Sequence, residues 1–166
     1  MRPQSMSKNI INIMTQLAKN EGLVRLVVNN DSEPLLTPVN ISLKDLINPN
    51  SPESKFMPLP FDVDATTTEG TFLRVYYNNG ELNENEVISE SQIHIDIICA
   101  KSLWLINDGD TSLIRPYEIM SRVMDLVGRN SINSTIRLEI NGYQHLYINK
   151  KYDAIRIYCE YMSIET

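Results

Sequence analysis

The first candidates for chemistry are two polar residues in the middle of the chain. His94 and Asp96 alternate with apolar residues in QIHIDIICA, so their side chains and that of Gln92 would project from one face of a strand. An imidazole and a carboxylate at this spacing could form a hydrogen bond or share a metal ion. Metal sites usually need three or four ligands, and the sequence signals no others nearby. We therefore interpret Gln92, His94 and Asp96 as a polar strip that is exposed or faces another subunit, with no metal.

The segment 107–111, NDGDT, is the second candidate because it carries several oxygen donors. It resembles a calcium loop only superficially, since it lacks the D-x-[DN]-x-[DN]-G spacing and the closing glutamate. A turn that leads into the N-terminus of a helix explains these residues better, and acidic side chains there would complement the helix dipole.

Motifs for catalysis and nucleotide binding are absent from the sequence. It contains no GxGxxG, Walker A, GxSxG, HExxH or CxxC. Cys99 and Cys159 lie in apolar alternating stretches, which favours buried, reduced thiols, although a disulfide between adjacent strands stays open. Lys150-Lys151 beside Tyr147 is too small a patch to indicate nucleic-acid recognition. We expect no cofactor and no enzymatic activity; the rival enzyme hypothesis requires an unrecognised site around His94 and Asp96.

Composition is typical of one globular domain. The 166 residues are 42% hydrophobic, and 21 acidic against 15 basic residues give a net charge of −6. This balance argues against broad binding of DNA or anionic membranes. No apolar run approaches the roughly 18 residues of a membrane span, and no secretory signal is evident, so we expect the protein to be cytoplasmic where it is made. Residues 1–6 are expected to be a flexible polar tail, and 7–166 a single domain.

Periodicity and turn signals predict the secondary structure. We expect a helix over 8–20 capped by Ser7, a buried strand over 23–28, and a short helix capped by Ser42. Asn79-Gly80 and Asn141-Gly142 predict turns. The remaining predictions are strands over 71–77, 87–100 (bent or bulged near 89–91), 136–140, 143–149 and 155–164, and a second main helix over 114–127. Together they indicate an α+β fold, with an antiparallel or mixed sheet packed against two main helices.

The segment 48–70 is expected to be a long extended loop, because it contains four prolines within a dozen residues. Two interpretations remain open. The loop is an arm that orders on a neighbouring subunit, or it lies across its own domain and covers part of the core. In either case its apolar residues are the expected anchors, namely Phe56, Met57, Leu59, Phe61 and Val63.

The order of these elements resembles that of the tail-terminator, or tail-completion, proteins of long-tailed bacteriophages. The similarity covers most of the chain from Ser7 onward. It is carried by an N-terminal helix ahead of an extended loop, the central strand QIHIDII, the helix RPYEIMSRVMDLVG, and the strands IRLEING and AIRIYCEYM. The 48–70 segment is longer than that pattern.

The resemblance implies a structural virion protein of the tail or neck. Such a protein forms a ring, expected here to be a hexamer, that ends the tail tube and joins it to the head connector. DNA would pass through the lumen without specific binding, and an acidic lumen suits that passage. The alternative is another phage connector, baseplate or adaptor module that binds partners without catalysis.

Overall fold

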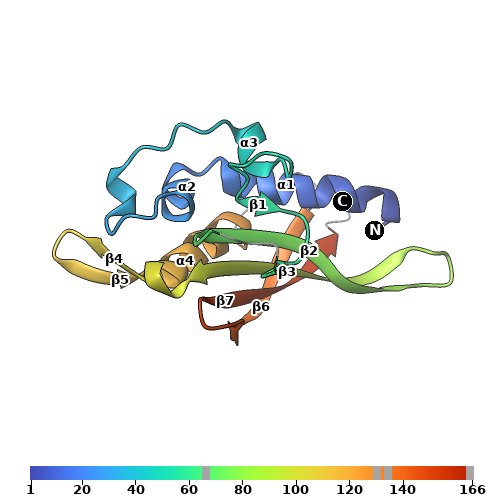
Figure 1. Ribbon diagram of the computed structural model, residues 1–166. Helices are drawn as coiled ribbons and strands as arrows, with labels where there is room; N and C mark the ends of the chain where they lie inside the picture. Colours follow the sequence, from blue (N-terminus) through green and yellow to red (C-terminus); the bar gives the residue numbers. More distant parts are fainter. Residues whose placement is uncertain (65–67, 129–131, 133–135, 164–166) are drawn as a thin grey trace.

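The computed structural model describes residues 1–64, 68–128, 132 and 136–163. A twisted five-stranded sheet carries helices on one face, and a small two-stranded sheet stands beside it (Figure 1). The helices are α1 (Met6–Ala18), α2 (Glu21–Val28), α3 (Leu43–Ile47) and α4 (Arg115–Val127). The strands are β1 (Phe56–Met57), β2 (Thr71–Leu82), β3 (Ile88–Ala100), β4 (Leu105–Asp108), β5 (Thr111–Ile114), β6 (Ile136–Tyr147) and β7 (Tyr152–Ser163). The predicted α+β class is confirmed.

The main sheet has the order β1-β2-β3-β7-β6 and is mixed, because β1 runs parallel to β2 while the other pairs are antiparallel. Its inner face packs on the helices. The predicted alternation in β3 is confirmed on this face, where the apolar side chains are completely buried: Ile93, Ile95, Ile97 and Cys99. The three isoleucines share one core with apolar residues of α1, α2 and α4. The outer face carries Gln92, His94 and Asp96.

The prediction of a strand over 23–28 is wrong, because these residues form most of α2. Its β-branched residues favoured a strand, but local capping favours a helix. The Asn20 side chain accepts a hydrogen bond from the Leu23 backbone N–H at 2.9 Å, and Arg25 donates to Glu21 one turn earlier. As a helix, the segment can bury apolar side chains on more than one side, because α2 packs against α1, α4 and β2.

The N-terminal helix begins two residues earlier than predicted and ends at Ala18. Ser7 lies inside α1 and does not cap it. The segment 1–6, expected as a polar tail, contacts the domain: Met1 donates its amino group to the Ile88 carbonyl at 3.0 Å and accepts from the Ile88 N–H at 2.7 Å. The predicted short helix with its Ser42 cap is confirmed in α3, where the Ser42 hydroxyl accepts from the Asp45 N–H.

Neither Asn-Gly pair makes a turn. Both lie within long strands beside a shift of register, at Tyr77/Asn79 in β2 and at Ile140/Gly142 in β6. A β-bulge accommodates an extra residue and increases the local twist. Asn and Gly are suited to such bulges as well as to turns, and here they lie at bulges within the strands. The bulge predicted near 89–91 is confirmed, because Glu81 pairs with Glu90 and Leu82 with Ile88, leaving Ser89 as the extra residue.

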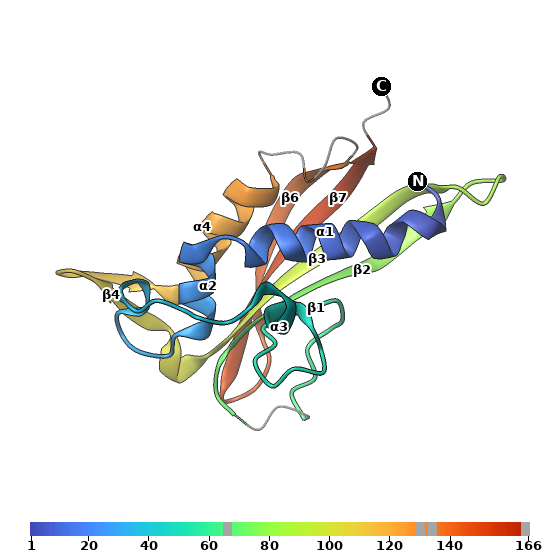
Figure 2. The ribbon, with the colours of Figure 1, turned by 90° about the horizontal axis from the view of Figure 1, so that it is seen from above.

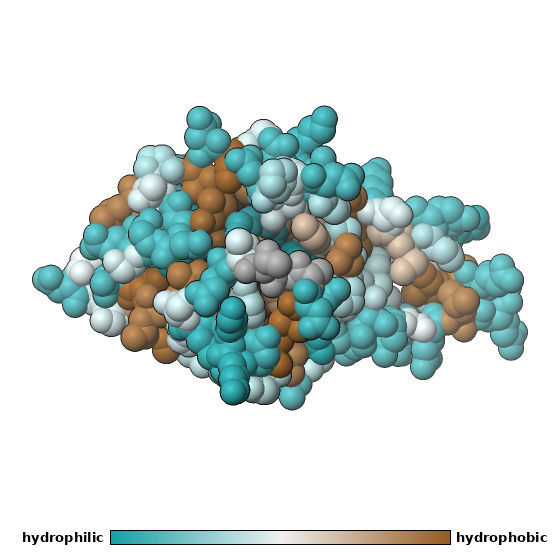
Figure 3. Space-filling view, viewed as in Figure 1, coloured by the Kyte–Doolittle hydropathy of each residue, from teal (hydrophilic) through white to brown (hydrophobic). Residues whose placement is uncertain are grey.

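The β2–β3 hairpin extends beyond the body of the molecule as an arm (Figures 1 and 2). Its turn lies at 83–87, where the Asn83 N–H donates to the Val87 carbonyl and Glu86 has a positive φ of 58°. Most of the arm's surface is hydrophilic, with a hydrophobic area beside the tip (Figure 3). At the end of β2, directly before the turn, Leu82 is 62% exposed.

Arg115 joins the helices to the connecting segments. Its side chain is 1% exposed and its guanidinium donates to the carbonyls of Leu103, Leu26, Asn29 and Asp31 at 2.7–2.9 Å. A cation beside carbonyls at the end of α2 complements the helix dipole there. Burial lowers the pKa of Arg115 from its ordinary value.

Cys99 and Cys159 are both buried and free, as the apolar alternation predicted. In the β3–β7 ladder Cys99 faces Asp153 while Cys159 faces Ile93, six positions away. At about 3.3 Å per residue the two thiols are roughly 20 Å apart, too far for a disulfide. No helix in the described parts of the chain is long and apolar enough to cross a membrane.

Candidate interaction surfaces

Asp96 is the centre of a hydrogen-bonded network on the outer face. Arg156, its partner in β7, donates from Nε and Nη2 to the two carboxylate oxygens at 2.8 and 3.0 Å. Tyr76, its diagonal neighbour in β2, donates its hydroxyl to Oδ2 at 2.7 Å. The contact with Asp96 raises the pKa of Arg156, and burial together with Asp96 raises that of Tyr76 to about 12. The carboxylate of Asp96 therefore accepts three hydrogen bonds, which use most of its bonding capacity within the chain.

His94 lies between two tyrosine rings. Tyr76 and Tyr158 occupy the directly opposite positions in β2 and β7, and both meet the imidazole edge-on, with centroids 5.6 and 5.1 Å away. The side chain is 4% exposed, and neither ring nitrogen has a hydrogen-bond partner. Burial lowers its pKa, as does the charge of Arg156, which outweighs the opposing effect of Asp96. His94 is consequently a neutral, packed ring.

The predicted polar strip is therefore only partly accessible. Gln92 accepts a hydrogen bond from the Asn78 amide at 3.0 Å, while His94 and Asp96 are covered by neighbouring tyrosine and arginine side chains. Their expected role in a subunit contact stays a prediction. Among the described residues, no group of three or more His, Cys, Asp or Glu side chains is placed to hold a metal ion.

The apolar anchors of the 48–70 segment divide between the two faces of the sheet. Phe56, in β1, is fully buried in the main core. Phe61 stacks on Phe72 at 5.5 Å on the outer face, and Val63 packs against the same small cluster. Met57 is half-buried, and Leu59 is 43% exposed. The described part of the segment thus lies across its own sheet, while Leu59 remains available to a partner.

Phe61 and Asp96, both candidates from the sequence, line one hollow of about 180 Å³ on the outer face. Sequence reasoning missed Arg74, which lies beneath this part of the loop. Its guanidinium faces the Phe61 and Phe72 rings, 5.5 Å from each centroid, and burial lowers its pKa to about 10. Arg74 alternates with the apolar residues Leu73 and Val75, which would have been the signal for an outward side chain, but the loop that covers it could not be inferred from spacing.

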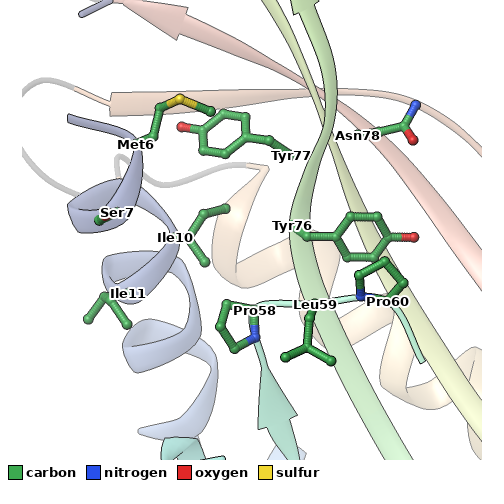
Figure 4. Close-up of a pocket in the computed structure, with 10 residues that line it drawn as sticks. All are labelled: Met6, Ser7, Ile10, Ile11, Pro58, Leu59, Pro60, Tyr76, Tyr77 and Asn78. Atoms are coloured by element: carbon green, nitrogen blue, oxygen red, sulfur yellow. The ribbon is translucent and has the colours of Figure 1, made fainter. Parts of the chain in front are cut away.

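A larger apolar groove of about 560 Å³ lies beside the free edge of β2 (Figure 4). The first half of α1 forms one side and β2 the other, and the segment 58–60 lies across the end of the groove between them. In the described chain β2 pairs with β1 only as far as Arg74, so this side of β2 is open from Val75 onward. Its lining residues are Met6, Ser7, Ile10, Ile11, Pro58, Leu59, Pro60, Tyr76, Tyr77 and Asn78.

The opposite edge of the sheet carries an exposed aromatic row on β6. Tyr143 and Tyr147 are 60% and 71% exposed. Between them, His145 stacks on Trp104 at 5.6 Å and contacts the Asp153 carboxylate at 2.8 Å. Tyrosine and tryptophan are enriched in protein interfaces, because a large apolar ring is combined with a polar group. The sequence contains eight tyrosines, several at alternate positions on strands, and this is the signal that indicates a sheet surface suited to a partner.

Two strand edges suited to protein contacts characterise the candidate site, and among the described residues no group is placed to hold a metal ion. No curated protein and no solved structure matches the chain. The YomW family model matches residues 20–161, which is most of the sequence and includes both edges and the arm. The chain therefore belongs to the YomW family, a phage-type family of proteins like those of Bacillus phage SPbeta.

Proposed function

We propose that this phage protein is a structural component of the tail or neck. In this role it forms a ring that ends the tail tube and joins it to the head connector, and it acts by assembly instead of catalysis. It would be made in the host cytoplasm and remain in the virion. Membership of a phage family supports the setting, and the resemblance of the element order to tail-terminator proteins supports the specific role.

The observation that carries the proposal is the pair of unlike open edges. β2 has a free edge beside an apolar groove, and β6, at the other side of the sheet, has an exposed aromatic row. When two different surfaces of one subunit join, the contact is heterologous, and its repetition closes a ring if the rotation permits. A symmetric dimer would instead leave one type of edge unused or pair each with itself.

Open strand edges in a solitary protein are an aggregation hazard unless they are protected. Here the protection is incomplete, since Tyr143, Tyr147 and Leu59 are exposed beside the two edges. A closed ring would cover both edges on every copy. With six copies the net charge of −6 per chain would give a strongly acidic assembly, which suits a channel through which DNA passes without adhering.

Electron microscopy of the purified full chain tests this function. Rings of uniform diameter, with a central hole and binding to the ends of purified tail tubes, are expected. An Ile11→Asp variant tests the contact, because it places a charge in the β2 groove. The Ile11 side chain is 46% exposed, so we expect the variant to fold but not to form rings. Isolated particles that do not bind tube ends would contradict the proposal.

The projecting β2–β3 arm also suits the alternative, a connector, baseplate or adaptor module that reaches a different protein (Figure 2). Such a module needs no contact between copies of itself. A single copy that binds a connector or baseplate protein through the arm would favour this alternative over the ring.

A further inference from the structure

The two open edges of the main sheet belong to strands that run in opposite directions. Each neighbouring pair among β2, β3, β7 and β6 is antiparallel, so β6 runs antiparallel to β2. When a second copy lies beside the first in the same orientation, its β6 meets the open edge of β2. The two strands are then antiparallel, and the inner faces of both sheets lie on the same side. The order of the strands therefore allows the sheet to continue from one copy into the next.

The backbone of β2 presents hydrogen-bonding groups at its open edge. The Leu73 N–H donates to the Lys55 carbonyl, on the β1 side, at 2.9 Å. In an antiparallel strand alternate residues direct their N–H and C=O to the same neighbour, so those of Tyr77 also point away from β3. In the described chain β1 ends at Met57, opposite Arg74, and no strand pairs with this side of Tyr77.

The opposite edge of the sheet presents its groups in the same phase. One row of directly paired residues crosses the sheet from β2 to β6 through Tyr77, Ile93, Cys159 and Ile140. Because Tyr77 points away from β3, Ile93 and Cys159 bond each other, and Ile140 directs its N–H and C=O away from β7. Tyr77 and Ile140 thus point outward at the two ends of one row. A copy placed beside the first without slip would continue the hydrogen-bond ladder.

Side chains beside this contact are also complementary. Tyr143 of β6 is opposite Ile157, whose side chain lies in the main core, so the tyrosine projects from the inner face. The row of Tyr143 ends at Val75 in β2, where α1 supplies Ile10 to the apolar groove and Leu59 lies across its end (Figure 4). A second copy in the same rows would bring its Tyr143 ring, 60% exposed in a single chain, to this groove.

We propose that β6 of a second copy pairs antiparallel with the open edge of β2, with Ile140 opposite Tyr77 and the Tyr143 ring in the apolar groove. Backbone hydrogen bonds join the strands, and the groove selects the side chain, as in other contacts made by strand addition. A slip of one residue would turn Tyr143 to the outer face and put the backbone groups out of phase, so the register is specific. The inference rests on the proposed function, because it specifies which residues join neighbouring subunits of the ring.

Engineered disulfides in the full chain test this register. Asn79 and Glu139 are exposed and lie at the two ends of one row, so the proposed contact makes them direct neighbours. Within one copy three strand spacings, about 14 Å, separate them, which is too far for a disulfide. The test variant carries Asn79→Cys and Glu139→Cys. The control combines Asn79→Cys with Gln144→Cys, an exposed position on the same face of β6 four rows, or about 13 Å, from Glu139.

After mild oxidation, non-reducing electrophoresis should show the test variant as a series of covalent oligomers up to the full ring. The wild-type chain, whose Cys99 and Cys159 are buried, and the Gln144 control should remain single chains. Equal cross-linking of the control, or no cross-linking of a test variant that light scattering shows to be assembled, would overturn this contact and leave the ring standing. A monomeric wild-type chain would overturn both.

Tyr143→Ala provides a second test that needs no new cysteine. Its ring is 60% exposed, so circular dichroism should show an intact fold. We expect assembly to require roughly tenfold higher concentration, because an aromatic anchor is lost from the contact. Tyr117→Ala, at a 41% exposed position on α4 outside both edges, should assemble like the wild type. Equal assembly of the two variants would remove Tyr143 from the groove and overturn the proposed register.

Discussion

Asp96 and Arg156 join β3 to β7 on the outer face through two charge-assisted hydrogen bonds, with the Asp96 side chain 7% exposed and that of Arg156 26% exposed. Replacement of Asp96 by alanine leaves the arginine without its carboxylate and the Tyr76 hydroxyl without its acceptor. We expect the free energy of unfolding to fall by about 2–3 kcal/mol. Urea denaturation measures it, with Glu90→Ala on the same strand as an exposed control. Equal values for both variants would refute this role.

His94 makes stability depend on pH. Its pKa is lowered in the folded chain, so as the pH falls below about 6.5 the unfolded chain binds a proton that the folded chain does not. This group therefore contributes stability that is present above its unfolded pKa and is lost as the pH falls.

A His94→Phe variant keeps an aromatic ring between Tyr76 and Tyr158 and needs no hydrogen bonds. We expect it to be at least as stable as the wild type at pH 7 and to lose less stability at about pH 5.5. Denaturation at both pH values measures the difference. His145→Gln is the control, since His145 is exposed and the control retains His94. A loss on acidification identical to that of the wild type would exclude His94 as the source.

Arg115 tests the link between α4 and the C-terminal end of α2. Arg115→Lys keeps a positive charge but cannot bond four carbonyls in the fixed geometry of a guanidinium. We expect a loss of about 2–4 kcal/mol, because buried carbonyls lose their donors. The thermal midpoint and urea denaturation report it, with the exposed Arg137→Lys as a matched control. A stable Arg115→Lys protein would show that the charge alone is sufficient.

The two interpretations of segment 48–70, a cover for its own core and an arm that binds a neighbour, can be tested by substitutions at different residues. Phe56→Ala should cost about 3–5 kcal/mol, because it opens a cavity in the main core. Leu59→Ala, at a 43% exposed position on the groove wall, should leave stability within about 1 kcal/mol and weaken assembly. Denaturation and light scattering on both variants check the division. A Leu59→Ala protein that assembles normally would remove the groove from the contact.

The sequence predicted the features that arise from strict periodicity and from specific capping. The alternation in β3, the Ser42 cap and the span of α4 could be predicted because each depends on residues that are neighbours along the chain. The segment 23–28 was misread because β-branched residues favour strands, whereas the cap at Asn20 and packing against α4 stabilise a helix.

The arrangement of surfaces was less accessible from the sequence. Asn79-Gly80 and Asn141-Gly142 are strong turn signals, but bulges in long strands use the same residue types. The β2–β3 and β6–β7 hairpins are consequently longer than predicted, and the point at which they diverge depends on where β3 and β7, two strands distant in sequence, stop pairing. The tyrosines around His94 likewise come from strands more than sixty residues apart, so no local pattern could show that the polar strip is covered.

The molar mass of the full chain, measured by light scattering across micromolar concentrations, tests the ring most directly. We expect one closed assembly of about six 19.0 kDa chains, whose mass does not grow further with concentration because every edge is then covered. A stable monomer throughout that range would contradict the ring.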